Sequence, residues 1–127
     1  MANILIIEDE ELIRDNLCLM LAESGYDVVT AGTGMTGVQK ICERAPDLIL
    51  CDIMLPGLDG YQVLKILRQS KTLFAIPFIF LTALADRDKW RKGMELGADD
   101  YITKPFTQNE LLQAIEARLS KQAFLLS

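Results

Sequence analysis

Leu48-Ile49-Leu50-Cys51-Asp52 is the stretch of sequence that decides the fold. Four apolar residues in a row, without polar alternation, are typical of a β-strand that is buried on both faces in a parallel sheet. An ionised carboxylate directly after such a run is expensive to bury unless a positive charge compensates it. The stretch therefore predicts a central strand of an α/β sheet, and it marks Asp52 as a residue that needs a functional explanation.

Comparable apolar runs occur at four other places, and helical patterns lie between them. The runs are Ile4-Leu5-Ile6-Ile7, Val28-Val29, Phe78-Ile79-Phe80-Leu81 and Tyr101-Ile102. Helical spacing of apolar residues is clearest over residues 12–24 (Ile13, Leu17, Met20, Leu21) and 36–45 (Val38, Ile41, Cys42, Ala45). Five alternations of strand and helix predict a single-domain (βα)5 fold, an open, doubly wound parallel sheet with helices on both faces.

Turn and capping residues agree with this division of the chain. Gly25 and Gly97 stand where helices are expected to end, and Asp59 is placed to cap the third helix. Thr107 and Glu110 have the spacing of a capping box at the start of the last helix.

Composition excludes several classes of protein. The chain has 127 residues, half of them apolar, and a net charge of -5 without a basic cluster, so direct contact with nucleic acid is not expected. No apolar run is long enough to cross a membrane, and no secretory signal is visible. Cys18, Cys42 and Cys51 are an odd number without C-x-x-C spacing, and we interpret them as reduced core thiols in a cytoplasmic protein.

Polar residues follow four of the five predicted strands. Glu8 and Asp9 follow the first strand, Asp52 the third, Thr82 the fourth and Lys104 the fifth. Each has a simpler explanation by itself, because an acid can cap the next helix, threonine suits a strand and lysine is usually solvated. Ligands of open α/β sheets bind beyond the carboxyl ends of the strands, however, and these five residues are expected at that edge.

Their combined chemistry favours phosphoryl transfer. Neighbouring carboxylates repel each other, which raises their pKa values unless a cation lies between them. Mg²⁺ suits such a site, because it binds through one or two carboxylates, waters and phosphate oxygens. A carboxylate nucleophile, a metal, the Lys104 amine and the Thr82 hydroxyl are the groups that phosphoryl transfer uses. We assign Glu10 and Glu11 to the start of the following helix.

The same residues carry a resemblance to a known family. The matching segments are Ile6-Ile7-Glu8-Asp9-Glu10, residues 52–60, Leu81-Thr82-Ala83 and residues 97–106. The sequence resembles the receiver domains of two-component response regulators over residues 2–121. The resemblance implies a flavodoxin-like sheet with strand order 2-1-3-4-5. It also implies a receiver domain over residues 1–121, followed by the start of a helical linker or a C-terminal tail over residues 122–127.

The resemblance further implies a role for each site residue. Asp52 would be the phosphoacceptor. Mg²⁺, which Mn²⁺ could replace, would be bound by the side chains of Asp9 and Asp52 and by the backbone carbonyl of Met54. Glu8 would bind this metal through a water.

The remaining roles concern the phosphoryl group and the response to it. Lys104 would contact the phosphoryl oxygens, and Pro105 would make the preceding peptide bond cis. Thr82 would close onto the phosphoryl group, and Tyr101 would change rotamer with it.

The resemblance implies partners as well. The phosphoryl donor would be a sensor histidine kinase or a histidine phosphotransfer protein. The chain would catalyse only its own phosphorylation and slow dephosphorylation, and would not be an enzyme in the ordinary sense. The surface that responds would consist of the fourth helix (about residues 86–96), the fifth strand and the last helix, and a homodimer could form there.

Four alternatives differ in the residues that they require. A haloacid-dehalogenase-type phosphatase needs a second aspartate where this chain has Met54. A flavin-binding domain needs a phosphate loop after the first strand, where three acids would repel a phosphate. A P-loop enzyme needs G-x-x-x-x-G-K, which is absent from the sequence. A degenerate receiver, acting only as a phosphorylation-independent interaction module, is the remaining alternative, although every expected polar position is filled.

Overall fold

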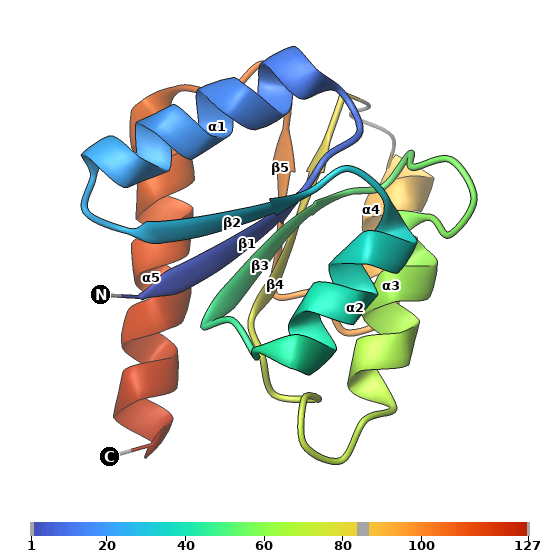
Figure 1. Ribbon diagram of the computed structural model, residues 1–127. Helices are drawn as coiled ribbons and strands as arrows, with labels where there is room; N and C mark the ends of the chain where they lie inside the picture. The colour runs from blue at the N-terminus through green and yellow to red at the C-terminus, as the bar shows by residue number, and fades with distance from the viewer. Residues whose placement is uncertain (1, 84–86, 127) are drawn as a thin grey trace.

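Five parallel strands form one sheet, and each strand is followed by a helix (Figure 1). The computed structural model describes residues 2–83 and 87–126, with side chains for all of them except residues 87–90 and 122–126. The elements are β1 (Asn3–Ile7), α1 (Glu11–Glu23), β2 (Asp27–Ala31), α2 (Gly34–Glu43), β3 (Leu48–Asp52), α3 (Gly60–Arg68), β4 (Phe78–Thr82), α4 (Arg87–Glu95), β5 (Asp100–Thr103) and α5 (Gln108–Leu126). The strand order is β2-β1-β3-β4-β5, which confirms the predicted fold class and order.

The sheet separates two hydrophobic cores. Helices α1 and α5 cover one face, and α2, α3 and α4 cover the other (Figure 1). The first core includes Ile4, Ile6, Leu17, Leu21, Leu48, Leu50, Ile79, Leu81, Ile102, Leu111 and Ile115. The second includes Leu5, Ile7, Ile41, Ile49, Cys51, Val63, Leu64, Leu67, Phe78 and Phe80. Because successive strand residues point to opposite faces, an uninterrupted apolar run such as Leu48–Cys51 fills both cores.

The second strand departs from the expectation of burial on both faces. All five residues of β1, β3 and β4 are buried, whereas Asp27 and Val29 of β2 are exposed. β2 is more exposed than these strands because it lies at the edge of the sheet and pairs only with β1.

The predicted caps and helix ends are present. The Asp59 side chain accepts from the Gln62 amide at 3.0 Å. The Thr107 hydroxyl oxygen accepts from the Glu110 amide at 3.1 Å, and the Glu110 carboxylate accepts in return from the Thr107 amide. Gly25 and Gly97, with φ of 93° and 100°, end α1 and α4 in the left-handed region that favours glycine.

The second helix begins and ends two residues earlier than its apolar pattern indicates. Thr33 caps it by accepting from the Thr36 amide at 3.0 Å, so the helix spans Gly34–Glu43. Cys42 and Ala45 were expected on its buried face, but both are exposed. The prediction of three core thiols is therefore wrong for Cys42, and Cys18 is only partly buried; Cys51 alone is a core thiol.

Arg68, the last residue of α3, joins three segments at the amino-terminal edge of β4 and β5. Its guanidinium donates to the backbone carbonyls of Phe74, Ile76 and Gly97 and to the Asp99 carboxylate. Asp99 Oδ2 also accepts from the Phe78 amide at 2.7 Å. The loops before β4 and before β5 are thus fixed to the end of α3.

Two further predictions concern the helices. Among the described residues, no helix is both long and apolar enough to cross a membrane. The backbone of α5 stays helical through Leu126, and Ser127 lies outside the described residues, as does Asp86, where the fourth helix was expected to begin.

Candidate functional site

The carboxyl ends of four strands bring the predicted polar residues together. A hollow of about 530 Å³ opens there, lined by Asp9, Glu10, Ile13, Asp52, Met54, Thr82, Ala83, Lys104 and Pro105. Glu8 is fully buried beside this hollow, whereas Asp9 is exposed. The five residues that the sequence placed at this edge therefore do lie at one site.

Asp52 is the last residue of the central strand and is only 8% exposed. One carboxylate oxygen, Oδ1, accepts from the Met54 amide at 3.2 Å. The other, Oδ2, lies 3.0 Å from Lys104 Nζ. The loop after β3 folds back beneath this carboxylate, because the Gly60 amide donates to the Ile53 carbonyl at 2.9 Å.

Gly60 is required by the closeness of this approach. A Cβ atom at Gly60 would lie 2.3 Å from the Asp52 carbonyl oxygen and 2.9 Å from the Ile53 Cα atom. Both neighbours are backbone atoms, so any side chain at residue 60 would displace the acceptor residue.

Lys104 reaches the site from β5. Its peptide bond to Pro105 is cis, and its own amide donates to the Thr82 carbonyl at 2.7 Å. Its Nζ atom lies between two carboxylates, 3.1 Å from Glu8 and 3.0 Å from Asp52. Burial acts to lower the pKa of Lys104, but the hydrogen bonds and charges of Asp52 and Glu8 outweigh it, and the net pKa is raised. Lys104 is therefore a fixed positive charge.

The surroundings of Glu8 compensate only part of the negative charge that this residue would carry as a carboxylate. Burial, together with the charge of the neighbouring Asp52 carboxylate, raises the pKa of Glu8 to about 8, although Lys104 acts to lower it. Its second oxygen, Oε2, is buried and has no hydrogen-bond partner among the described residues. One lysine is thus not enough for the two buried carboxylates.

A divalent cation fits this imbalance. Single oxygens of Glu8, Asp9 and Asp52 lie within 4.8 Å of one another. Carboxylate oxygens are hard ligands of the kind that Mg²⁺ binds, and the adjoining hollow leaves room for the waters that it retains. Together with the unpartnered Glu8 oxygen, this donor set is suited to Mg²⁺.

Thr82 and Tyr101 lie on neighbouring strands, two register positions apart. In the pairing of β4 with β5, Phe80 is opposite Tyr101 and Thr82 is opposite Thr103. Thr82 is 1% exposed, and Tyr101 is half-buried against the core that contains Phe80. The two predicted switch residues are therefore on the same face of the sheet, and Tyr101 is the aromatic residue of β5.

Sequence reasoning missed Arg14. Its guanidinium donates to the Glu8 carbonyl at 2.9 Å, so a second cation borders the acidic segment after β1. A basic residue one turn after Glu10 and Glu11 was the available signal. Glu10 itself occupies the N-cap position of α1, as expected, but its side chain makes no capping hydrogen bond.

Comparison with known proteins agrees with the fold and the site. The family model for the response regulator receiver domain matches residues 4–116. The chain is 46% identical over 118 residues to the alkaline phosphatase synthesis transcriptional regulatory protein PhoP of Bacillus subtilis, covering 93% of this chain and 48% of that protein. It is 43% identical over 114 residues to the phosphate regulon transcriptional regulatory protein PhoB of Escherichia coli, covering 90% of this chain and 50% of that protein. The chain thus spans about half the length of these relatives.

Solved structures give the same result. The signal receiver domain of a signal transduction histidine kinase from Syntrophus aciditrophicus superposes with a TM-score of 0.89 at 35% identity, over 95% of this chain and 92% of that chain. A response regulator receiver domain protein from Clostridium thermocellum superposes with a TM-score of 0.91 at 29% identity, over 98% and 99%.

Fold and site together define a receiver-type signalling domain of the flavodoxin-like class. The chain belongs to the response regulator receiver domain family, and it serves in two-component signal transduction. Its acidic cluster has the composition of the Mg²⁺ site of that family.

Proposed function

We propose that Asp52 accepts a phosphoryl group from a phosphohistidine on a partner protein in a Mg²⁺-dependent reaction. The observation that supports this most strongly is the setting of Asp52 at the end of the central strand. It borders an open hollow, with Lys104 on one oxygen and two further carboxylates nearby. Such a carboxylate is suited to act as the nucleophile of phosphoryl transfer, which depends mainly on positioning and charge neutralisation.

In the proposed reaction, a carboxylate oxygen of Asp52 bonds to phosphorus as the bond between phosphorus and the histidine nitrogen breaks. That nitrogen keeps the electron pair, and the other ring nitrogen carries a proton, so the imidazole leaves neutral. The side chains of Asp9 and Asp52 and the Met54 backbone carbonyl would hold Mg²⁺ or Mn²⁺, with Glu8 reaching it through a water, and the cation would supply positive charge to the transferring group. Lys104 supplies a second positive charge to the phosphoryl oxygens, and the Thr82 hydroxyl donates to one of them.

The proposed chemistry is limited to this chain's own aspartate. A haloacid-dehalogenase-type phosphatase needs a general acid two residues after the nucleophile, and Met54 has no titratable group. Phosphorylation of Asp52 followed by slow hydrolysis is therefore the reaction cycle that we propose.

Incubation with acetyl phosphate and Mg²⁺ tests the proposal. The protein should gain one hydroxylamine-sensitive phosphoryl group by mass spectrometry, and EDTA should prevent it. Asp52→Asn should abolish labelling, while Asp59→Asn, the same chemical change at a helix cap, should label normally because asparagine also caps helices. If folded wild-type protein stays unlabelled, the chain is a degenerate receiver that acts only as an interaction module.

The partner that we propose is a sensor histidine kinase or a histidine phosphotransfer protein. A groove of about 250 Å³ lies beside the site, between α1 and the segment after β5. Its position supports the proposal that the partner protein approaches from this side. The groove is lined by Ile13, Asn16, Leu17, Met20, Lys104, Pro105 and Phe106. A partner seated there would lie next to Lys104 and hence next to the acceptor. We further propose a cytoplasmic location, where such a kinase would present its histidine.

The output that we propose is a change in the surface formed by α4, β5 and α5. Homodimerisation through this surface remains a prediction, in which charged residues of the surface, Asp99 among them, would form the contact. Asp99 forms an ion pair with Arg68 at 3.1 Å and accepts from the Phe78 amide, so it is part of the fold. The other charged residues that we expect on this surface are of both signs: Arg91, Lys92, Asp100, Glu110, Glu116 and Arg118. We place the receiver domain at residues 1–121 and the start of a linker or tail at residues 122–127.

A further inference from the structure

Arg14, near the start of α1, holds the backbone of the acidic segment that follows β1. Its Nη1 atom donates to the Glu8 carbonyl oxygen at 2.9 Å. That oxygen belongs to the peptide unit between Glu8 and Asp9. Because a peptide unit is planar, a bond that fixes this oxygen also fixes the direction in which the chain enters Asp9. Arg14 therefore acts on the backbone of one of the three clustered acids.

Asp9 has little other support. The preceding residue is still held by the sheet, since the Glu8 amide donates to the Ala31 carbonyl at 3.0 Å. Asp9 itself is exposed and forms no hydrogen bond or ion pair with any residue that the structure describes. Glu10, which follows it, makes no capping hydrogen bond with its side chain. The orientation of Asp9 thus depends on the hydrogen bond that Arg14 makes one peptide unit before it.

Gly32, in the loop between β2 and α2, leaves the space that the guanidinium occupies. A Cβ atom at residue 32 would lie 3.2 Å from Arg14 Nη1 and 3.9 Å from Arg14 Cζ. Apart from the chain neighbours of Gly32, no other described atom would lie within 4 Å of it. Any side chain at this position would therefore displace the guanidinium by a few tenths of an ångström.

Charge alone would give Arg14 the opposite effect on a bound metal. A guanidinium is always ionised and repels Mg²⁺, so its electrostatic contribution weakens cation binding at the neighbouring carboxylates. A hydrogen bond that orients a metal ligand strengthens binding, and loss of such an outer partner typically lowers metal affinity about 10–100-fold. Because the two effects differ in sign, a measurement of Mg²⁺ affinity separates them.

We propose that Arg14 is a positioning residue of the Mg²⁺ site, which holds Asp9 in the orientation that binds the metal. The inference rests on the proposed Mg²⁺ site and adds to it a residue that does not touch the metal. Arg14 forms no ion pair with any residue that the structure describes, so its contact with the site is the hydrogen bond to the Glu8 carbonyl.

Replacement of Arg14 by methionine removes the donor and the charge but keeps a long, unbranched side chain. Calorimetric Mg²⁺ titration of Arg14→Met should show binding about tenfold weaker than in the wild type, whereas loss of a repelling charge alone would strengthen it. Arg14→Lys, whose ammonium can donate to the same carbonyl, should stay within about threefold of the wild type. At saturating Mg²⁺, Arg14→Met should be phosphorylated by acetyl phosphate within about twofold of the wild-type rate, which a damaged fold would not allow.

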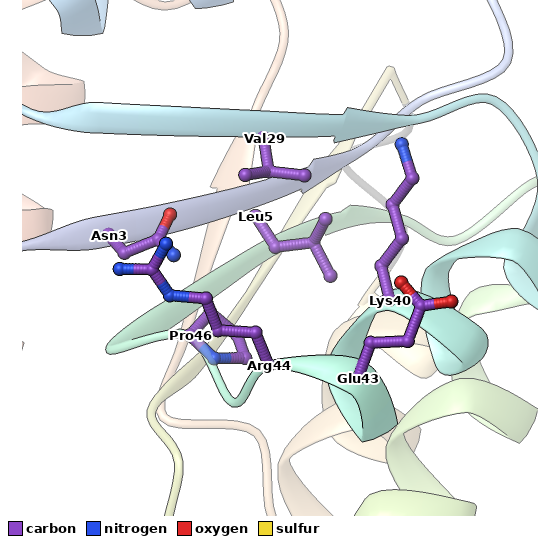
Figure 2. Close-up of a pocket in the computed structure, with 7 residues that line it drawn as sticks. All are labelled: Asn3, Leu5, Val29, Lys40, Glu43, Arg44 and Pro46. Atoms are coloured by element: carbon purple, nitrogen blue, oxygen red, sulfur yellow. The ribbon is translucent and has the colours of Figure 1, made fainter.

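Arg44→Met is the matched control. Arg44 lines a pocket on the α2 side of the sheet together with Asn3 and Leu5 (Figure 2). Because Asn3 begins β1 and the acidic segment follows the end of that strand, Arg44→Met should leave Mg²⁺ binding unaltered. Equal weakening by Arg44→Met and Arg14→Met would overturn the proposal.

Gly32→Ala tests the same contact from the opposite side. It should weaken Mg²⁺ binding about twofold to threefold, and it should add nothing to Arg14→Met, in which the guanidinium is absent. The proposal is overturned if Arg14→Met binds Mg²⁺ as well as or better than the wild type, or if the two changes are additive. Absence of Mg²⁺ binding by the wild type would overturn the proposed metal site too, whereas normal wild-type binding with an unaffected Arg14→Met would overturn only this inference.

Discussion

The Nζ atom of Lys104 lies 3.0 Å from Oδ2 of Asp52, so cation and acceptor are in direct contact before any phosphoryl group is attached. The same Nζ atom lies 3.1 Å from Glu8 Oε1. Lys104 therefore holds together two carboxylates that would otherwise repel each other, and its replacement should affect the metal-free protein most.

Replacing Lys104 with methionine should lower the free energy of unfolding in EDTA by about 1–3 kcal/mol, because two buried carboxylates lose their cation. Millimolar Mg²⁺ should recover more stability in this variant than in the wild type, since the metal supplies the missing charge. Urea unfolding followed by circular dichroism measures both effects. Lys65→Met, at an exposed position, should stay within about 0.5 kcal/mol of the wild type. Equal losses in the two variants would contradict the role of Lys104.

The raised pKa of Glu8 predicts a dependence on pH. The pKa is about 8 in the metal-free fold, against an ordinary value of 4.5. Between these values the folded protein holds a proton that the unfolded chain has lost, so metal-free stability should fall as the pH rises from about 4.5 to about 8. Mg²⁺ binds the ionised carboxylates, so its affinity should rise over the same interval. Glu8→Gln should flatten both curves, as measured by urea unfolding and by calorimetric Mg²⁺ titration.

The two adjacent acids after β1 should differ in their effect on metal binding. Asp9 belongs to the cluster whose oxygens lie within 4.8 Å of one another, whereas Glu10 is the N-cap residue of α1. Asp9→Ala should weaken Mg²⁺ binding about tenfold or more, and Glu10→Ala should change it little. The test is Mg²⁺ titration by calorimetry, and similar losses in both variants would refute this division of roles.

Gly60→Ala should disturb the acceptor without touching its side chain. The added Cβ atom would lie 2.3 Å from the Asp52 carbonyl oxygen, so the backbone must shift, which should cost about 1–3 kcal/mol and slow phosphorylation by acetyl phosphate. Gly57→Ala is the control, because residue 57 has a φ of +74° but no atom within 4 Å of an added Cβ. It should lose about 1–2 kcal/mol of stability and still be phosphorylated at the normal rate.

The switch prediction concerns Thr82 and Tyr101. Beryllofluoride, a phosphoryl mimic, should shift the amide signals of Thr82, Tyr101 and residues 86–96. The amide signals of α1 and α2 should stay unchanged away from the metal site. Thr82→Ala should retain phosphorylation and weaken the distant shifts, while Thr103→Ala, at the paired position of β5, should preserve them. Shifts confined to the neighbours of Asp52 would mean that the domain accepts a phosphoryl group without switching.

The sequence was informative where a local rule fixes the position of a residue. Asp52 and Thr82 end buried strands of one parallel sheet, so their proximity follows from the alternation of strands and helices alone. Cys42 shows the limit of helical periodicity, because the pattern over 36–45 did not reveal where Thr33 would start the helix. The pairing of Arg68 with Asp99 is long-range and uses loop carbonyls, and the hydrogen bond of Arg14 depends on how the chain turns after β1. Neither follows from spacing in the chain.

The contacts of Arg68 with Asp99 and the Gly97 carbonyl also bear on how a signal could travel through α4. Gly97 comes directly after the last turn of this helix, so that end is anchored to α3 and to the start of β4. The opposite end follows Thr82, the residue expected to move. We therefore expect a small displacement beyond Thr82 to tilt α4 about its anchored carboxyl end. A partner that binds α4 would then respond to a change in the orientation of the helix more than to a change in its position.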